Sequence, residues 1–250
     1  MKSIPPQPFV IQLDAVDSTN NYAANLLKRS KVVNGTIILT KRQENGKGQR
    51  GANWQSAPDK NLTCSVVLYP EWDAMDIFRL NILTSLAVGD MLKGYGLNAA
   101  IKWPNDIYVG NKKIAGILIE SQIKGQKIAS SIVGVGLNVN QRTFYGSFKA
   151  TSVTIECGTS FEINQVARQF WNALINQIEL NGELPLKALQ NLYYQRLVGY
   201  RTPIGFEDNT GQYNGTIVGL DEIGRLCVES TDGKLRKYQM KEVKQFLDTF

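Results

Sequence analysis

The chain has 250 residues, of which 43% are hydrophobic and 20% are charged, and its formal net charge is +6. This composition excludes a disordered chain and allows one large domain, or one domain with a small appendage. The chain contains no histidine, which excludes Ser-His-Asp and Cys-His catalysis and histidine-ligated zinc. Any chemistry must therefore use lysine, arginine, carboxylates, amides and the backbone.

Several features bear on the compartment and the partners. Residues 1–8 are rich in proline and lack the apolar segment of a signal peptide, and no apolar run is long enough to cross a bilayer. Cys64, Cys157 and Cys227 are far apart and odd in number, so we expect reduced core thiols in a cytoplasmic protein without a membrane partner. The positive charge is scattered and comes with no helix-turn-helix pattern. We therefore expect no nucleic-acid partner; a nucleotide substrate and an acidic protein partner explain the charge equally well.

The apolar patterns predict the elements in chain order. Strands are expected at 9–13, 36–40 and 62–69, and helices at 20–29 and 77–93. A run of antiparallel strands is expected at 101–103, 107–109, 114–120 and 127–140, followed by helices at 163–180 and 184–197. These elements predict an α+β fold with a mixed, largely antiparallel sheet flanked by helices.

After Gly199 the sequence no longer alternates between strands and long helices, and short strands follow one another. Short strands at 202–206, 212–220, 226–230 and 235–240 are separated by turns, which is typical of a small β-barrel of roughly 50 residues. We therefore predict a domain over 1–198 and a second one over 199–250. Extra strands of a single domain are the alternative.

A glycine-rich loop lies between two of the expected strands. Gly46, Gly48 and Gly51 alternate with cationic and amide side chains, and the backbone N–H groups of such a loop can close on an anion. A dinucleotide-binding loop would open a helix, whereas this segment leads through a turn into a strand. The better interpretation is a flexible flap that becomes ordered over its ligand.

Two strands carry candidate site residues. From 132 to 140, period-two alternation places valine and leucine on one face and Gly134, Gly136 and Asn138 on the other. The second face suits a strand that lies under a ligand; bulges or close helix packing are the alternative. On the strand that begins at Lys113, this residue should share its inward face with Ala115, while Lys112 faces solvent, unless a bulge intervenes.

Together these motifs resemble the biotin–protein ligase (holo-carboxylase synthetase) family. The resemblance runs from Asp14 to the C-terminus. It rests on Asp17-Ser18-Thr19-Asn20, the glycine loop flanked by Gln43 and Trp54, Lys102-Trp103-Pro104-Asn105-Asp106, Lys113-Ile114-Ala115-Gly116, and the Gly-x-Gly-x-Asn strand. It implies a class II synthetase-like catalytic domain with an SH3-like C-terminal barrel, in the short form without a DNA-binding domain.

The resemblance also implies the chemistry. Biotin and ATP, with Mg²⁺, would give biotinyl-5′-AMP, and biotin would then pass to a lysine of a biotin carboxyl carrier domain of a carboxylase. The implied catalytic residues are Lys113, Arg50 and Asp106, the last to hold Mg²⁺–phosphate or to relay a proton. The implied biotin-binding residues are Ser18, Thr19, Asn20, Gln43, Lys47, Gly48, Gln49, Lys113, Gly116 and Gly136. The implied ATP-binding residues are Arg50, Trp54, Asn105 and Asn138. No residues are assigned as metal ligands, and a homodimer is left open.

Two alternatives and one departure from the family pattern accompany this hypothesis. The alternatives are a lipoate–protein ligase on the same scaffold and a biotin-responsive binding protein without turnover. The departure lies in the loop, where the family commonly has arginine at the positions of Lys47 and Gln49. Lysine keeps the charge and glutamine loses it, so we expect weaker retention of the intermediate. Asp17, Ser18 and Thr19 are also expected to cap the helix that follows.

Overall fold

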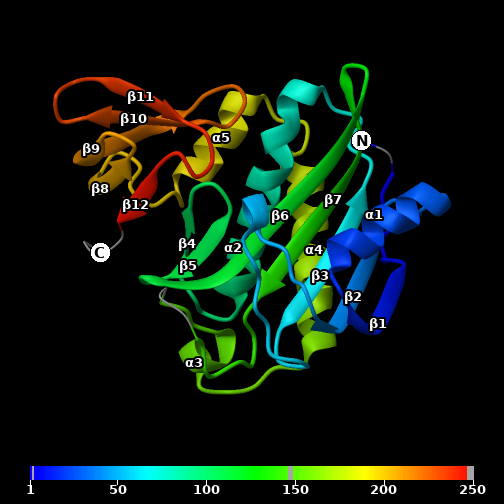
Figure 1. Ribbon diagram of the computed structural model, residues 1–250. Helices are drawn as coiled ribbons and strands as arrows, with labels where there is room; N and C mark the ends of the chain where they lie inside the picture. Colours follow the sequence, from blue (N-terminus) through cyan, green and yellow to red (C-terminus); the bar gives the residue numbers. More distant parts are fainter. Residues whose placement is uncertain (2, 146–148, 247–250) are drawn as a thin grey trace.

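The structure is a computed structural model that describes residues 1, 3–145 and 149–246. A seven-stranded sheet lies at its centre (Figure 1). Its strands are β1 (Val10–Val16), β2 (Thr36–Gln43), β3 (Leu62–Leu68), β4 (Ala99–Lys102), β5 (Asp106–Val109), β6 (Lys112–Lys124) and β7 (Lys127–Leu137). They are arranged in the order β1-β2-β3-β7-β6-β5-β4.

The pairing confirms the mixed, largely antiparallel sheet. β1 and β2 are parallel, and the other neighbours are antiparallel. Helix α1 (Thr19–Arg29) connects the parallel pair, because two parallel neighbours need a crossover connection rather than a tight hairpin.

Helices cover both faces of this sheet. α1 packs on β2, β3 and β7, whereas α2 (Arg79–Gly94) and α4 (Ile163–Asn181) lie against the opposite face (Figure 1). The remaining helical elements are the 3₁₀ turns η1 (Gln49–Gly51) and η2 (Ala74–Phe78), and the helices α3 (Val153–Cys157) and α5 (Leu186–Tyr194). α2 is mostly apolar and is buried over most of its length, as expected for a helix between a sheet and other helices. None of the helices that the structure describes is both long and apolar enough to cross a membrane.

The C-terminal strands form a second sheet. They are β8 (Pro203–Asp208), β9 (Gly211–Leu220), β10 (Leu226–Ser230), β11 (Leu235–Tyr238) and β12 (Lys244–Phe246), in the order β11-β10-β9-β8-β12. All neighbours are antiparallel. In the part of the chain that the structure describes, the outer strands β11 and β12 do not pair, so the expected closed barrel is not found. A pattern of short strands cannot distinguish an open sheet from a closed one, because closure depends on how the two edges meet.

The second sheet is attached to the main one through a common core. Phe206 and Ile217 belong to the same buried apolar cluster as Phe78 and Tyr193. The indole Nε1 of Trp103 donates a hydrogen bond of 3.0 Å to a backbone carbonyl in the β9–β10 connection, that of Gly224. The division at residue 199 stays a prediction. Of the cysteines, Cys64 and Cys227 are buried as expected, Cys157 is half-buried, and all three are free thiols.

Candidate functional site

A cavity of about 270 Å³ opens on the sheet face that carries α1. It is bounded by the start of α1, the glycine loop, the β4–β5 turn, strands β3, β6 and β7, and the β11–β12 connection. Most of the predicted site residues line it: Ser18, Thr19, Asn20, Gln43, Lys47, Gly48, Gln49, Trp54, Asn105, Asp106, Lys113, Gly116 and Gly136. Residues that lie up to 118 positions apart in the sequence are thus brought to one place. The side chain of Arg50 lies outside the described residues.

The floor of the cavity is bare backbone. Gly116 on β6 pairs with Gly136 on β7, and Gly134 lies two residues earlier on β7. A Cβ atom at Gly136 would collide with the indole of Trp54, and one at Gly134 would collide with the amide of Asn20. The glycines therefore let side chains from the loop and from α1 reach the sheet.

Lys113 reaches this floor because β6 contains a bulge. Ile107 pairs with Ala115 but the next residue, Tyr108, pairs with Lys113, so Ile114 is the extra residue. The bulge moves Lys113 to the face of Gly116, and the Lys113 Cε atom lies 3.5 Å from the position that a Gly116 Cβ atom would take. The predicted face shared with Ala115 is therefore wrong: Ala115 is fully buried in the core. Register arguments fail at a bulge because it breaks the period of two.

Lys113 forms an ion pair at the cavity. Its Nζ atom lies 2.6 Å from Oδ1 of Asp106, and the two side chains are 21% and 25% exposed. The same ammonium lies 5.6 Å from the centre of the Trp54 ring. Partial burial strengthens both interactions relative to water. Lys112 is exposed and pairs with Glu156 at 3.6 Å, so the two adjacent lysines do have different environments.

A buried polar cluster occupies the other end. The Ser65 hydroxyl lies within hydrogen-bond distance of Thr19 Oγ1, at 2.7 Å, and of Asn20 Oδ1, at 2.6 Å. Thr19 donates its backbone N–H to Gln43 Oε1 at 2.9 Å. Asn20 donates from Nδ2 to Glu120 Oε2 at 2.7 Å. Because the Gln43 oxygen is engaged by Thr19, its amide nitrogen is the group available as a donor, while Asn20 Oδ1 keeps a lone pair for a further donor.

Two members of this cluster were not predicted. Ser65 is fully buried and stands in a strand of otherwise mostly apolar residues, and a polar side chain at such a position needs a partner. Ser65 could therefore have been recognised in the sequence as a polar residue within an apolar strand. Nothing local marks Glu120, which reaches Asn20 from β6 across 100 positions of sequence. The expected side-chain cap is also absent: Ser18 holds the N-cap position of α1 but makes no capping hydrogen bond.

The glycine loop is a short hairpin. Lys47 and Asn53 form an antiparallel bridge, and the N–H of Gly48 donates to the carbonyl of Ala52 at 2.6 Å. Lys47 Nζ donates to Asn21 Oδ1 on α1 at 2.5 Å. Backbone bonds, the Lys47–Asn21 hydrogen bond and the packing of Trp54 on the sheet glycines thus hold the loop over the cavity, with η1 at its tip (Figure 1).

The β4–β5 turn has a supporting role. Asn105 Nδ2 donates to the carbonyl of Ile117 at 2.5 Å, and Tyr193 donates from its hydroxyl to the carbonyl of Pro104 at 3.3 Å. These bonds fix the turn from which Asp106 enters β5.

Asn138 does not reach the cavity. Its side chain is 4% exposed and donates to the carbonyl of Thr151 at 2.9 Å. The alternation that predicted Gly134, Gly136 and Asn138 on one face holds for the two glycines. β7 ends at Leu137, and beyond its end the period of two no longer applies.

The C-terminal segment contributes a wall that was not predicted. Met240, Lys241 and Val243, from the β11–β12 connection, line the cavity. No motif or apolar pattern in this stretch points to a site, because the placement comes from how the second sheet packs.

Comparisons with known proteins agree with this geometry. Residues 13–138 match the model of the biotin/lipoate A/B protein ligase family. The biotin–[acetyl-CoA-carboxylase] ligase of Paracoccus denitrificans is 30% identical over 237 residues, which cover 89% of this chain and 95% of the relative. The bifunctional ligase/repressor BirA of Bacillus subtilis is 28% identical, over 92% of this chain and 72% of the relative.

A solved structure is similar over nearly the whole length. The biotin protein ligase of Aquifex aeolicus in complex with biotin and ATP aligns with a TM-score of 0.75 and 26% identity, covering 95% of this chain and 98% of that one. The family match spans half of the chain and includes most of the cavity. The chain belongs to the biotin/lipoate A/B protein ligase family.

Proposed function

We propose that this protein is an ATP-dependent biotin–protein ligase. It joins biotin and ATP to give biotinyl-5′-AMP and pyrophosphate, and then transfers biotin to a lysine of a biotin carboxyl carrier domain. One observation carries this proposal: the Lys113–Asp106 ion pair and the polar cluster around Thr19 and Asn20 lie at one glycine floor. That arrangement provides a cation for a carboxylate and a phosphate beside donors and acceptors for a cyclic urea.

The first step requires charge neutralisation above all. A biotin carboxylate oxygen attacks the α-phosphorus of ATP, and the bond from this phosphorus to the oxygen that bridges to the β-phosphorus breaks. Both reactants are anions, so a fixed ammonium that lies beside them lowers the barrier. Lys113 is assigned this role, because it lies on the floor beside Gly116 with little exposure. Asp106 is assigned to orient the ammonium.

The polar cluster suits the ureido ring of biotin. A cyclic urea offers two N–H donors and one carbonyl acceptor, and the cluster presents Asn20 Oδ1 as an acceptor and the Gln43 amide nitrogen as a donor. We assign to the biotin end the cavity residues Ser18, Thr19, Asn20, Gln43, Lys47, Gly48, Gln49, Gly116 and Gly136.

The nucleotide end is assigned to the other side of Lys113. Trp54 offers an aromatic face over the floor glycines, and such a face can stack on adenine. Asn105 and Arg50 are assigned to the same end. Asn138 is assigned a supporting role below the floor, because its amide is bonded to the backbone of Thr151.

In the second step a neutral lysine amine of the carrier domain attacks the acyl carbon of the adenylate. The bond from this carbon to the phosphate oxygen breaks, AMP leaves, and an amide forms. The amine must lose a proton, and Asp106 is the only carboxylate among the described residues that line the cavity. We assign Asp106 as the group that receives this proton.

Mg²⁺ is expected to enter with ATP. No group of three or more acidic or cysteine side chains that could hold a metal occurs among the described residues. Mg²⁺ often binds through substrate phosphates and water with one protein carboxylate, and Asp106 can supply that carboxylate. The ion would neutralise phosphate charge.

We further propose that residues 1–198 form the ligase domain and that residues 199–250 form a second unit. The second unit contributes Met240, Lys241 and Val243 to the wall of the cavity. This contact supports a role of the C-terminal unit in closing the site.

A mass measurement tests the function. The protein is incubated with biotin, MgATP and a biotin carboxyl carrier domain, and the carrier is weighed by mass spectrometry. One added biotinyl group on a single lysine is the expected result. Parallel incubation with lipoate and a lipoyl domain tests the lipoate alternative, and an unmodified carrier with intact biotin binding would instead identify a binding protein without turnover.

A further inference from the structure

Glu120 belongs to the polar cluster of the cavity, although it does not line the cavity itself. It lies on β6, is exposed, and reaches the cluster through the bond of 2.7 Å that Asn20 Nδ2 donates to its Oε2 atom. Asn20 is 3% exposed and does line the cavity. Any effect of Glu120 on a bound ligand is therefore transmitted through Asn20.

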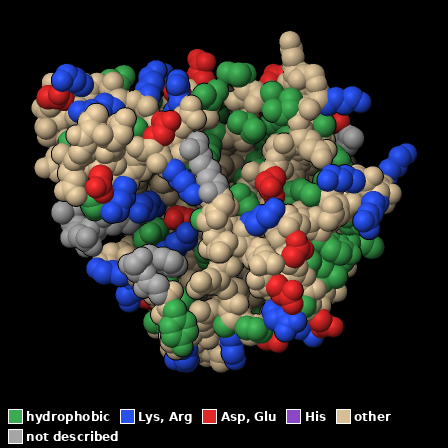
Figure 2. Space-filling view, viewed as in Figure 1, with side chains coloured by type: hydrophobic (Ala, Val, Ile, Leu, Met, Phe, Trp, Pro, Cys, Tyr) green, Lys and Arg blue, Asp and Glu red, His purple; other side chains and the backbone are tan. Residues whose placement is uncertain are grey.

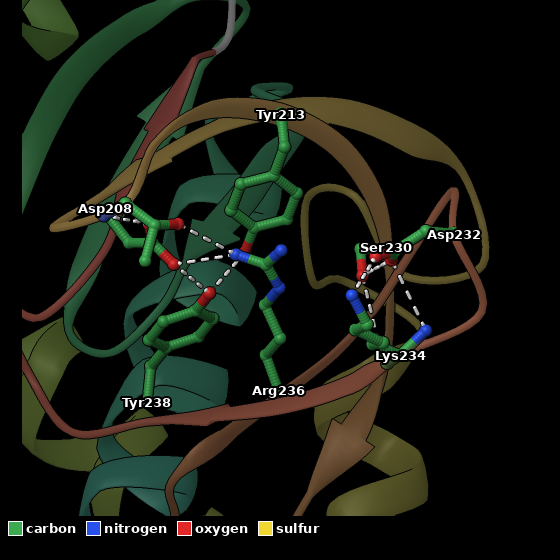
Figure 3. A network of polar contacts seen from close by, with 8 residues as sticks. Asp208, Tyr213, Ser230, Asp232, Lys234, Arg236 and Tyr238 are labelled. Atoms are coloured by element: carbon green, nitrogen blue, oxygen red, sulfur yellow. Dashed lines mark hydrogen bonds and ion pairs between the residues drawn. The ribbon is translucent and has the colours of Figure 1, made fainter.

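The negative charge of Glu120 is not neutralised by an ion pair. No lysine or arginine among the described residues lies within ion-pair distance of its carboxylate. Asp208 in the C-terminal sheet shows the opposite case, since it accepts hydrogen bonds from Arg236 Nη1 at 3.0 Å and from the Tyr238 hydroxyl at 2.6 Å (Figure 3). Lysine and arginine side chains gather where that sheet meets the main body (Figure 2), and α1 lies on the opposite side of the molecule (Figure 1). The carboxylate of Glu120 is thus left to act on the neutral amide of Asn20.

The amide of Asn20 has two orientations that differ by a half-turn, and Glu120 distinguishes between them. A carboxylate only accepts hydrogen bonds, so Glu120 holds the amide nitrogen toward β6 and the amide oxygen toward Ser65 and the cavity. The carbonyl of Leu118 acts in the same direction, but its distance of 3.4 Å from Nδ2 makes that contact weak.

The groups on the other side of Asn20 accept either orientation. The Ser65 hydroxyl lies 2.6 Å from Asn20 Oδ1 and 2.7 Å from Thr19 Oγ1, and a hydroxyl can both donate and accept. If the amide turned, Ser65 could accept from its nitrogen and donate to Thr19 instead. Gly134 has no Cβ atom that would obstruct the amide. The choice between the two orientations is therefore made mainly by Glu120.

We propose that Glu120 is a positioning residue that determines the specificity of the cavity for a cyclic urea. By fixing the amide of Asn20, it presents an oxygen rather than a nitrogen to the ligand, and this oxygen accepts a hydrogen bond from a ureido N–H. The inference rests on the proposed function, since biotin is the ligand. With the amide turned, two N–H donors would face each other in a buried site, and neither would have an acceptor.

Two substitutions of Glu120 change this preference to different degrees. In Glu120→Lys a donor replaces an acceptor, which favours the turned amide. A charge-assisted hydrogen bond corresponds to roughly ten- to a hundredfold, and because Glu120 is exposed we expect about tenfold weaker binding of biotin. In Glu120→Gln the new amide can donate or accept, so both orientations are populated and affinity falls about twofold, in proportion to the competent fraction. Glu229→Lys, the same substitution at an exposed position of β10, is the control and should bind biotin like wild type.

Analogues of biotin separate a change of orientation from general damage to the site. Binding of biotin and of two cyclic carbamates, each with one ureido N–H replaced by an ether oxygen, is measured by calorimetry on the full chain without ATP. The carbamate whose ether oxygen faces Asn20 requires a donor there. It should therefore bind Glu120→Lys at least as tightly as it binds wild type. Circular dichroism checks that each variant is folded.

The outcomes distinguish this inference from the proposed function. Equal weakening of biotin and of both carbamates in Glu120→Lys would mean that Glu120 only supports the structure, and unchanged biotin binding would mean that it does not orient Asn20; either result overturns the inference. If Glu120→Lys does not fold, Glu120→Gln decides: a twofold shift of the affinity ratio toward one carbamate supports the inference, and an unchanged ratio overturns it. A wild-type protein that binds no biotin would instead refute the proposed function.

Discussion

The Nζ atom of Lys113 lies 2.6 Å from Oδ1 of Asp106, across the pairing of two neighbouring strands. We expect this contact to fix the ammonium before it meets a phosphate, and preorganised charge of this kind is a large source of rate enhancement. The sequence offers no acidic residue within six positions before Lys113. The partner comes from strand pairing.

Replacing Lys113 with alanine should abolish most of the adenylation activity. Removal of one preorganised donor costs about 2.7–4 kcal/mol, which is a hundred- to a thousandfold in rate. Single-turnover formation of biotinyl-5′-AMP measures this effect. Lys112→Ala is the control: it removes the same charge from an exposed site paired with Glu156, and should behave like wild type. Equal impairment of both variants would refute the assignment of Lys113.

Replacing Gln49 with arginine should slow the escape of the adenylate. Gln49 lines the cavity, and a guanidinium there would add a charge-assisted contact to the phosphate, worth about 1.5–3 kcal/mol. The release rate of labelled biotinyl-5′-AMP from the preformed complex is the measurement. Gln55→Arg places the same charge on an exposed position of the same loop, outside the first cavity, and should leave the rate unchanged. Unchanged or faster release from Gln49→Arg would contradict this view of the loop.

Replacing Gly136 with alanine should weaken ligand binding. The new Cβ atom would collide with the Trp54 indole, and overpacking of this kind costs about 1–3 kcal/mol. We expect roughly tenfold weaker biotin binding in equilibrium dialysis, because the indole must move into the cavity. Gly94→Ala, at a position where a Cβ atom meets nothing within 4 Å, should bind biotin normally. Normal binding by Gly136→Ala would indicate that the floor is not in contact with the ligand.

Replacing Asp208 with asparagine should reduce stability near neutral pH. Hydrogen bonds from Thr210 and Tyr238, and the guanidinium of Arg236, hold the pKa of Asp208 far below its usual value. A lowered pKa in the folded state gives stability that is present above the unfolded pKa of about 4 and is lost as pH falls. The gap in melting temperature between wild type and variant should therefore be largest near pH 7 and shrink below about pH 4. Glu222→Gln, an exposed change in the β9–β10 turn, serves as the control; a gap that is constant with pH would refute the argument.

The sequence predicted the elements and the main sheet because each strand and helix has a local apolar period. It did not predict α3, which is five residues long and too short to carry a period. The parallel pairing of β1 with β2 was missed too, since pairing partners are not local properties.

The candidate site shows the same contrast between features that are local in the sequence and features that depend on tertiary structure. Residues within motifs, such as Thr19, Asn20, Asp106 and Lys113, converge on the cavity as expected. Lys113 faces the cavity for a different reason than predicted, because a bulge at Ile114 shifts the period of β6. Ser65 and Val243 belong to no motif. They reach the site through sheet pairing and packing, which a single sequence does not display.

The bond from Trp103 to Gly224 has a consequence for the order of folding. It joins residues 121 positions apart, and the indole is 4% exposed. A contact of such long range requires a large loss of conformational entropy on loop closure, and it cannot form until the later part of the chain is available. The turn that carries Asp106 therefore gains its last support only when the C-terminal sheet has folded. Competence for catalysis should arise last, after the main sheet and its helices are in place.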